Sequence, residues 1–226
     1  MSILFEEKEH VLIMDKKIAG QLGFWASAIF AVTEGIYIPL IIYTILTVGL
    51  SSNFPPLVQL VGGIITFIAL PVMVIIFTSI RYVNDDDNEI LGSLGVSFIL
   101  LFAATVSINR FVQLTVIQQS LPDVPADLVR FLPYGTGSVM FALEILGWGF
   151  FSSLAALFVA PLFSGSRLKT TIRWFFILYA ILSLLSAFSF ATNIFIPTGP
   201  IAWGPILLVI TILLSVYFRN LEKQAA

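Results

Sequence analysis

Six stretches of this sequence are long and apolar enough to cross a lipid bilayer as helices, and no other feature constrains the fold as strongly. They comprise residues 21–48, 57–80, 90–116, 137–163, 171–194 and 201–218. A helix needs about 20 mostly apolar residues to cross the hydrocarbon core, and only helices or closed barrels satisfy the backbone polar groups there. The sequence therefore predicts an all-α polytopic integral membrane protein with six transmembrane helices.

The overall composition supports the same fold class. Hydrophobic residues make up 58% of the chain and charged residues 11%, whereas about 25% of the residues in an ordinary soluble domain are charged. Too few polar side chains remain to cover a soluble core. We expect one transmembrane domain over residues 21–218, an N-terminal tail over 1–20 and a C-terminal tail over 219–226.

The positive charges predict the orientation, because cytoplasmic loops of membrane proteins carry an excess of Lys and Arg. If both termini are cytoplasmic, that side collects nine cations: Lys8, Lys16, Lys17, Arg81, Arg167, Lys169, Arg173, Arg219 and Lys223. The outer side receives only Arg130, and Arg110 lies inside the third span. We therefore expect a multi-pass protein of the inner (cytoplasmic) cell membrane with both termini inside.

The connection between spans three and four, residues 121–137, has its own apolar pattern. Pro125 would open a short helix, and Leu128, Phe131 and Leu132 would form its apolar face. The pattern predicts a short interfacial helix on the outer leaflet. It would act either as a lid over an outward-facing cavity or as a simple membrane anchor.

Three charged residues lie within the predicted spans: Glu34, Arg110 and Glu144. Charges at this depth are costly, so they tend to face the bundle, find partners and mark functional sites. Arg110 lies about 20 residues past the inner start of span three, and Glu144 about seven residues past the outer start of span four. Both therefore belong to the outer leaflet, and we predict that they form an ion pair.

Further polar side chains extend this candidate site. Asn109 and Gln113 follow each other at a spacing of four on the third span, with Arg110 beside them. Glu34 lies near the middle of the first span, with no cation at its depth. We take Glu34, Asn109, Arg110, Gln113 and Glu144 as the candidate ligand-binding or ion-pair residues. The alternative is that they only hold the helices together.

An acidic run precedes the third span. Asp85, Asp86 and Glu89 resemble the aspartate-rich motif with which membrane prenyltransferases hold magnesium and a diphosphate. That family uses two such motifs in a longer chain, whereas this sequence has one. The competing interpretation is a capped helix N-terminus.

Several chemistries are excluded by residue type. The chain has no cysteine, and its one histidine, His10, lies in the predicted tail, so thiolate sites and histidine clusters are ruled out and we expect no cofactor. The net charge of -2 does not suit nucleic acid, which requires a dense basic patch. The expected partners are the lipid bilayer, a small-molecule or lipid ligand, and another membrane protein.

The segments INRFVQLTV and GSVMFALEILGWGFFSSLAALFVAPLFSGSRLKTTIRW resemble small prokaryotic multi-pass membrane proteins that are described only as domains of unknown function. The resemblance implies a prokaryotic inner-membrane setting and no particular activity. Chain length and span number also resemble the substrate-binding subunits of energy-coupling vitamin transporters. Those subunits present an Ala-rich docking face on the first helix, of which this chain has only Ser27 and Ala31.

Three functions remain open on the sequence alone. The first is binding or transport of a small or amphipathic solute in a bundle cavity lined by the five candidate residues. The second is a structural or regulatory subunit of a membrane complex. The third is a membrane enzyme that modifies a lipid or isoprenoid through Asp85, Asp86 and Glu89. An enzyme is the less favoured class, because no catalytic constellation is evident.

Overall fold

The computed structural model describes residues 2–49, 54–84, 88–121, 123–133, 137–194 and 197–224, with side chains described from residue 16 to residue 223. The regular secondary structure in these ranges is helical, with turns and short loops between the helices, and no strand occurs among them. The α-helices are α1 (Ser2–Val48), α2 (Pro56–Val83), α3 (Glu89–Val112), α4 (Gln118–Ser120), α5 (Val139–Glu144), α6 (Ser152–Val159), α7 (Arg167–Thr192), α8 (Gly199–Ile201) and α9 (Leu207–Gln224).

Five shorter segments of other helical types occur among the described residues. Three are π-helical: η1 (Gln113–Ile117), η3 (Ile145–Phe151) and η5 (Ala202–Ile206). Two are 3-10 helices: η2 (Val129–Phe131) and η4 (Ala160–Leu162). The π-helical segments join consecutive α-helices without a break, so that several labelled elements form one continuous membrane-length helix.

Six of these continuous helices are long and apolar enough to cross a membrane, as predicted. They are Lys16–Val48, Pro56–Val83, Glu89–Ser120, Val139–Leu162, Arg167–Thr192 and Gly199–Lys223. Each overlaps one of the six stretches expected from hydropathy. The all-α class and the number of spans are therefore confirmed.

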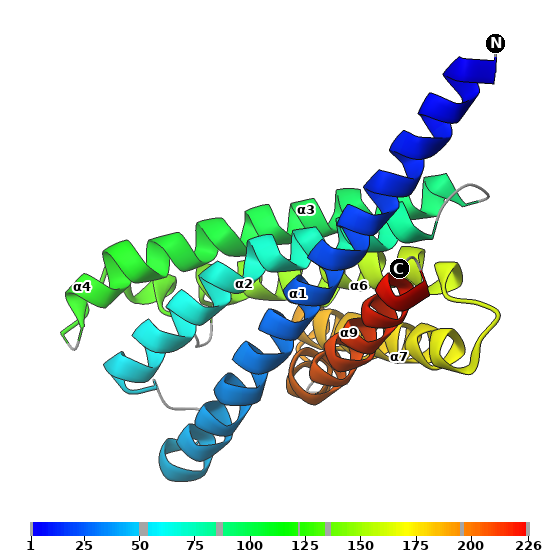
Figure 1. Ribbon diagram of the computed structural model, residues 1–226. Helices are drawn as coiled ribbons and strands as arrows, with labels where there is room; N and C mark the ends of the chain where they lie inside the picture. The colour runs from blue at the N-terminus through cyan, green and yellow to red at the C-terminus, as the bar shows by residue number, and fades with distance from the viewer. Residues whose placement is uncertain are drawn as a thin grey trace.

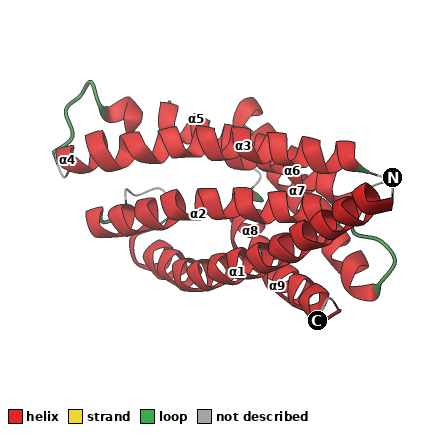
Figure 2. Cartoon of the chain, turned by 45° about the horizontal axis from the view of Figure 1, so that its top comes forward, coloured by secondary structure: helices red, strands yellow, loops and turns green. Residues whose placement is uncertain are grey.

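The spans form a ring in which neighbours in sequence are neighbours in space. Figures 1 and 2 show from the side how α1 lies along α2 and near α9. Helix α1 packs against α2, α2 against α3, α3 against α6, and α6 against α7. Helix α9 contacts both α7 and α1, which closes the ring. Large aromatic side chains fill the interior, among them Phe30, Phe102, Phe163, Phe176 and Phe218.

Glycines allow the third, fourth and fifth spans to approach closely. An ideal Cβ atom on Gly147 would lie 2.4 Å from a methyl group of Val106, and one on Gly149 would lie 2.9 Å from Cβ of Ala187. Small residues at such contacts let helix backbones pack tightly in lipid, where dispersion forces rather than water exclusion hold helices together. The fourth span is accordingly the most buried of the six.

Two segments differ from the predicted outline. Helix α1 begins at Ser2, so residues assigned to an N-terminal tail continue the first span as one helix of 47 residues. The predicted helix between spans three and four is a single 3-10 turn, η2, preceded by a turn from Pro125 to Leu128. Leu132 is extended (φ -60°, ψ 148°), as expected for a residue before a proline, so Pro133 ends the segment.

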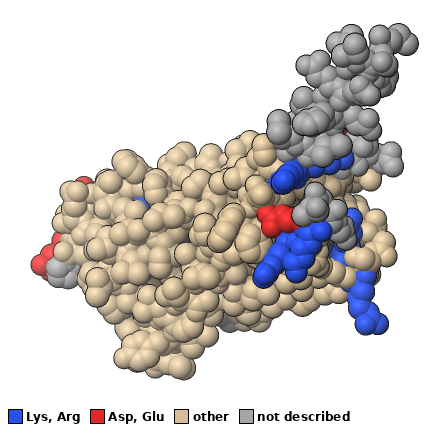
Figure 3. All heavy atoms as spheres, in the orientation of Figure 1, with Lys and Arg blue, Asp and Glu red and all other residues tan. Residues whose placement is uncertain are grey.

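Most charged side chains gather at one end of the bundle. Lys16 and Lys17 of α1 lie on that side, as do Arg81 in the last turn of α2, Arg167 at the start of α7 and the C-terminal part of α9. Figure 3 shows Lys and Arg concentrated around the end of the molecule that carries the N-terminal part of the chain. Between the two ends many large hydrophobic side chains are exposed, among them Val32, Leu100 and Phe188, as lipid contact requires.

Candidate functional site

A cluster of four polar side chains joins the third and fourth spans. Arg110, near the end of α3, forms an ion pair through Nη2 with Oε1 of Glu144, at the end of α5. Asn109 donates from Nδ2 to Oε2 of Glu144 at 2.5 Å and to the carbonyl oxygen of Met140 at 3.1 Å. The predicted pair of Arg110 with Glu144 is therefore present, and Asn109 binds the second carboxylate oxygen.

Gln113 closes this cluster into a loop of hydrogen bonds. Its Oε1 accepts from Nη1 of Arg110 at 2.8 Å, and its Nε2 donates to Oδ1 of Asn109 at 2.9 Å. Asn109 is fully buried, and the side chains of Arg110 and Glu144 are only 11% and 12% exposed. The cluster of Asn109, Arg110, Gln113 and Glu144 is called the outer polar cluster below.

The sequence spacing explains why these groups meet. Asn109 and Gln113 are four residues apart on one helix, and Arg110 and Gln113 are three apart, so all three side chains share one face. Glu144 approaches that face from the antiparallel fourth span at matching depth. A buried charge pair is tolerable only with good geometry and further hydrogen bonds, and the two amide side chains supply one such bond to Nη1 of Arg110 and one to Oε2 of Glu144.

Both helices change geometry beside the outer polar cluster. In the third span the amide N–H of Gln118 bonds to the carbonyl of Gln113, five residues back. In the fourth span the N–H of Ser152 bonds to the carbonyl of Gly147, again five residues back. These are π-helical bonds, and π segments inside α-helices frequently occur at functional sites. Here η1 begins with Gln113, and η3 begins one residue after Glu144.

A second group of polar side chains continues from the cluster toward the middle of the bundle. The indole of Trp148 lies one turn beyond Glu144, and its ring centroid is 6.4 Å from that of Trp203. The indole N–H of Trp203 donates to Oγ of Ser183 at 3.1 Å. One turn away on α7, the hydroxyl of Tyr179 lies 2.8 Å from Oγ of Ser152. All of these groups are buried or half-buried.

Trp148 and Ser152 are not among the site residues predicted from the sequence. Their signal was the spacing of Glu144, Trp148 and Ser152, which recur every fourth residue and so fall along one side of the fourth span. An indole and a serine are common in apolar helices. The spacing indicates a polar face on the fourth span only when Glu144 is counted together with Trp148 and Ser152.

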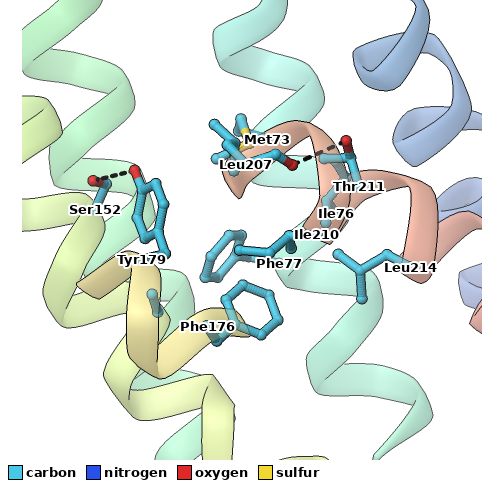
Figure 4. A pocket seen from close by; sticks show the side chains of 11 residues that line it. Met73, Ile76, Phe77, Ser152, Phe176, Tyr179, Leu207, Ile210, Thr211 and Leu214 are labelled. Carbon is cyan, nitrogen blue, oxygen red and sulfur yellow. Dashed lines mark hydrogen bonds between the residues drawn. The ribbon is translucent and has the colours of Figure 1, made fainter. Parts of the chain in front are cut away.

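Two spaces in the bundle can be described by volume and lining. A cavity of about 10 Å³, about the lower limit for one water molecule, lies between α2, α6, α7 and α9. Figure 4 shows the hydrogen bond between Ser152 and Tyr179 at one side of it and apolar side chains such as Phe77 and Phe176 in its lining. A groove of about 280 Å³ between α1 and α2 is open at the surface.

Neither of these two spaces is lined by a residue of the proposed site. The solute-binding hypothesis predicted a pocket at the depth of the outer polar cluster, open toward the outer leaflet. Instead, the four side chains there are closed on one another by their hydrogen bonds. A solute would therefore have to displace at least one of these bonds in order to reach Arg110 or Glu144.

Glu34 is separate from the outer polar cluster. It is 7% exposed and lies on α1, whose packing partners are α2, α9 and the π segment η5. Among the residues with described side chains, no hydrogen bond or ion pair joins Glu34 to Asn109, Arg110, Gln113 or Glu144. The five residues predicted as one site therefore form two, at different positions in the ring.

The acidic residues before the third span were the candidate metal ligands. Asp85 and Asp86 lie outside the described residues. Glu89 is exposed and forms an ion pair with Arg81, with Nη2 and Oε1 3.1 Å apart. Within the part of the chain that the structure describes, no three Asp, Glu or His side chains are grouped as a metal site would require.

A ring of six membrane-length apolar helices, with charged side chains buried between them, defines a multi-pass α-helical membrane protein. Comparison with known proteins gives no matching family model, no similar curated protein and no similar solved structure.

Proposed function

We propose that this protein binds or transports a small or amphipathic solute in the inner cell membrane, and that the outer polar cluster is its binding site. The observation that supports the proposal is the burial of a complete ion pair, with two amide partners, beside π-helical turns in both helices. Charged groups within a membrane commonly mark solute or ion pathways. Both termini would lie in the cytoplasm, in agreement with the distribution of Lys and Arg.

The chemistry of the cluster suggests how a solute would be held. A carboxylate or phosphate group on the solute would replace Glu144 as the partner of the Arg110 guanidinium, which binds such planar or multivalent anions well. Asn109 and Gln113 each carry a donor and an acceptor and would bind hydroxyl or amide groups. In the proposed orientation, the solute would enter from the outer side of the membrane.

A ligand screen on the purified protein tests this function. Small carboxylates, phosphates and amphiphiles would be added singly, and the midpoint of thermal unfolding measured in detergent. A solute present at 100 times its Kd adds about 2.7 kcal/mol to the free energy of unfolding, which is readily measured as a rise in Tm. We expect at least one class of compound to raise the Tm of the unmodified chain.

The matched variant is Arg110→Gln combined with Glu144→Gln. It removes both charges while keeping side chains that can hydrogen-bond, and Asp127→Asn in the exposed outer loop serves as a control. We expect the double variant to fold and to lose the ligand-induced rise in Tm. Unchanged stabilisation by the same ligand in the folded double variant would show that the pair only braces the helices.

A structural or regulatory subunit is the second candidate, and the exposure of α1 favours it. In the most apolar part of the first span only 17% of the residues are buried inside the protein, compared with 61% in the fourth span. A photoreactive residue at Val32, which is 63% exposed, would cross-link a partner helix in native membranes. The same probe at Leu100 on α3 provides the control. Adducts with lipid alone at Val32 would count against a partner on this face.

A further inference from the structure

Two buried polar groups on one face of α1 have no hydrogen-bond partner among the residues with described side chains. Ser27 is fully buried and its Oγ is unpaired. Glu34, two turns further along, is 7% exposed and has neither an ion-pair partner nor a hydrogen bond among these residues. Burial of an ionised carboxylate without a hydrogen-bond donor is costly. The protonation state of Glu34 in the closed bundle therefore needs a physical explanation.

The packing of α1 shows what surrounds this carboxyl group. Glu34 shares a stripe with Gly23, Ser27 and Phe30, at spacings of four, three and four residues. Gly23 packs on the ring of Phe218 in α9. One turn beyond Glu34, Tyr37 covers Gly62 of α2, and Ile38 approaches Gly204 of η5. The carboxyl group therefore faces the seam where α1 meets the second and sixth spans.

The charged groups on the elements that pack against α1 are distant from Glu34. Helix α2 carries Arg81 near its inner end, and α9 carries Arg219, Glu222 and Lys223 beyond Phe218. The contact of Phe218 with Gly23 places that end about 16 Å from Glu34 along the helix axis, because 11 residues separate Gly23 from Glu34. The segment η5 has no charged residue. Lys17 on α1 itself is about 26 Å away.

Other titratable groups near Glu34 are tyrosines. Tyr37 lies on α1 itself, and the Tyr179 hydroxyl of α7 is close enough to the Glu34 carboxyl for an electrostatic interaction. Tyr179 cannot neutralise a carboxylate, and its hydroxyl already lies 2.8 Å from Oγ of Ser152. Arg110 is paired with Glu144 in the outer polar cluster. Among the side chains that the structure describes, the only buried cation, Arg110, is thus paired with Glu144, and Glu34 has no cationic partner.

A bound metal cation would fit this environment poorly. Hard cations in proteins require several oxygen ligands, whereas among the described residues no three His, Cys, Asp or Glu side chains are grouped as a metal site would need. A proton needs only one carboxylate oxygen. We propose that Glu34 is a proton-binding site: the carboxylic acid stays protonated while the seam of α1 with α2 and α9 is closed, and it ionises to a carboxylate, releasing one proton to water, when that seam opens.

This proposal rests on the proposed function. A solute transporter that holds an exchangeable proton in its core can couple movement of the solute to movement of the proton. The protonation itself can be tested without any transport. Infrared difference spectroscopy of the full chain in lipid resolves the C=O stretch of a protonated carboxylic acid from the bands of carboxylates. We expect the unmodified protein at pH 7 to show this band, shifted in heavy water, and Glu34→Gln to lose it.

Glu222→Gln, near the exposed end of α9, is the matched control and should keep the band. Because glutamine is a neutral isostere of the protonated acid, Glu34→Gln should also retain the Tm of the unmodified protein. A band that persists in Glu34→Gln would overturn the proposal, as would a Glu34 band that disappears when sodium or potassium is added at constant pH, since that result indicates a metal-cation site. Failure of the ligand screen would leave the infrared result unaffected.

Discussion

At the residue scale, the balance between charge burial and hydrogen bonding decides what Arg110 and Glu144 contribute. Transfer of both ions out of water costs several kcal/mol each, and their attraction offsets that cost only with good geometry and further hydrogen bonds. Asn109 and Gln113 provide those bonds. The cluster is thus stable as a unit, while each of its charges would be strongly unfavourable alone.

Arg110→Ala should therefore be much more damaging than removal of both charges. The single change leaves Glu144 buried without its cation, and we expect a loss of about 3–5 kcal/mol in the free energy of unfolding. Arg110→Gln with Glu144→Gln should lose clearly less. Equilibrium unfolding by denaturant in mixed micelles measures both. An Arg110→Ala loss no greater than that of the double variant would mean that water or lipid headgroups already solvate the pair.

The sequence was sufficient to predict this pair but not the isolation of Glu34. Counting residues from each span's start places Arg110 and Glu144 at one depth, and the order of the chain makes spans three and four neighbours. Depth alone gives no position around the ring. From the sequence alone, Glu34 could be grouped with the other four residues because its position around the ring was unknown. The packing of α1 against α2 and α9 separates Glu34 from the outer polar cluster.

At the element scale, the spans combine regular α-helix with π-helical turns and glycine contacts. The ends of the spans could be predicted because apolar runs, prolines and charges mark them. The π segments could not, because hydropathy reports how apolar a helix is and not whether its N–H groups bond four or five residues back. The glycine contacts are equally invisible until the partner residue is known, as with Gly147 and Val106.

Gly147→Ala tests the close contact of the third and fourth spans. The new Cβ would lie 2.4 Å from Cγ2 of Val106, and relief of such overpacking typically costs about 1–3 kcal/mol. We expect a corresponding fall in the free energy of unfolding, recovered in part when Val106→Ala is added. Gly20→Ala, where a Cβ meets nothing within 4 Å, is the control. Equal losses at Gly147 and Gly20 would contradict this packing.

At the scale of the whole molecule, the ring order and the charge distribution predict one topology. The six spans alternate in direction, so the connection around Ser164 and both termini share one side, and Ala126 lies on the other. Lys and Arg concentrate on the first of these sides (Figure 3). From the positive-inside rule we predict that this side faces the cytoplasm.

Single-cysteine variants test the topology directly, because the natural sequence contains no cysteine. A membrane-impermeant maleimide added to intact cells should label Ala126→Cys and leave Ser164→Cys unlabelled. After permeabilisation both should react, since both positions are exposed. The reverse pattern would place the termini outside, and the outer polar cluster would then face the cytoplasmic leaflet.

The π-helical turns also affect how this chain can be compared with others. A π turn accommodates one more residue than an α turn, so a helix can gain or lose a residue there while the segments before and after keep their faces. Related chains could therefore differ in length by one residue within 113–117, 145–151 or 202–206 without any change of neighbours. An alignment that holds the spacing constant through these helices would then shift Glu144 relative to Ser152, and it would pair the wrong residues where the charge and its polar neighbours lie.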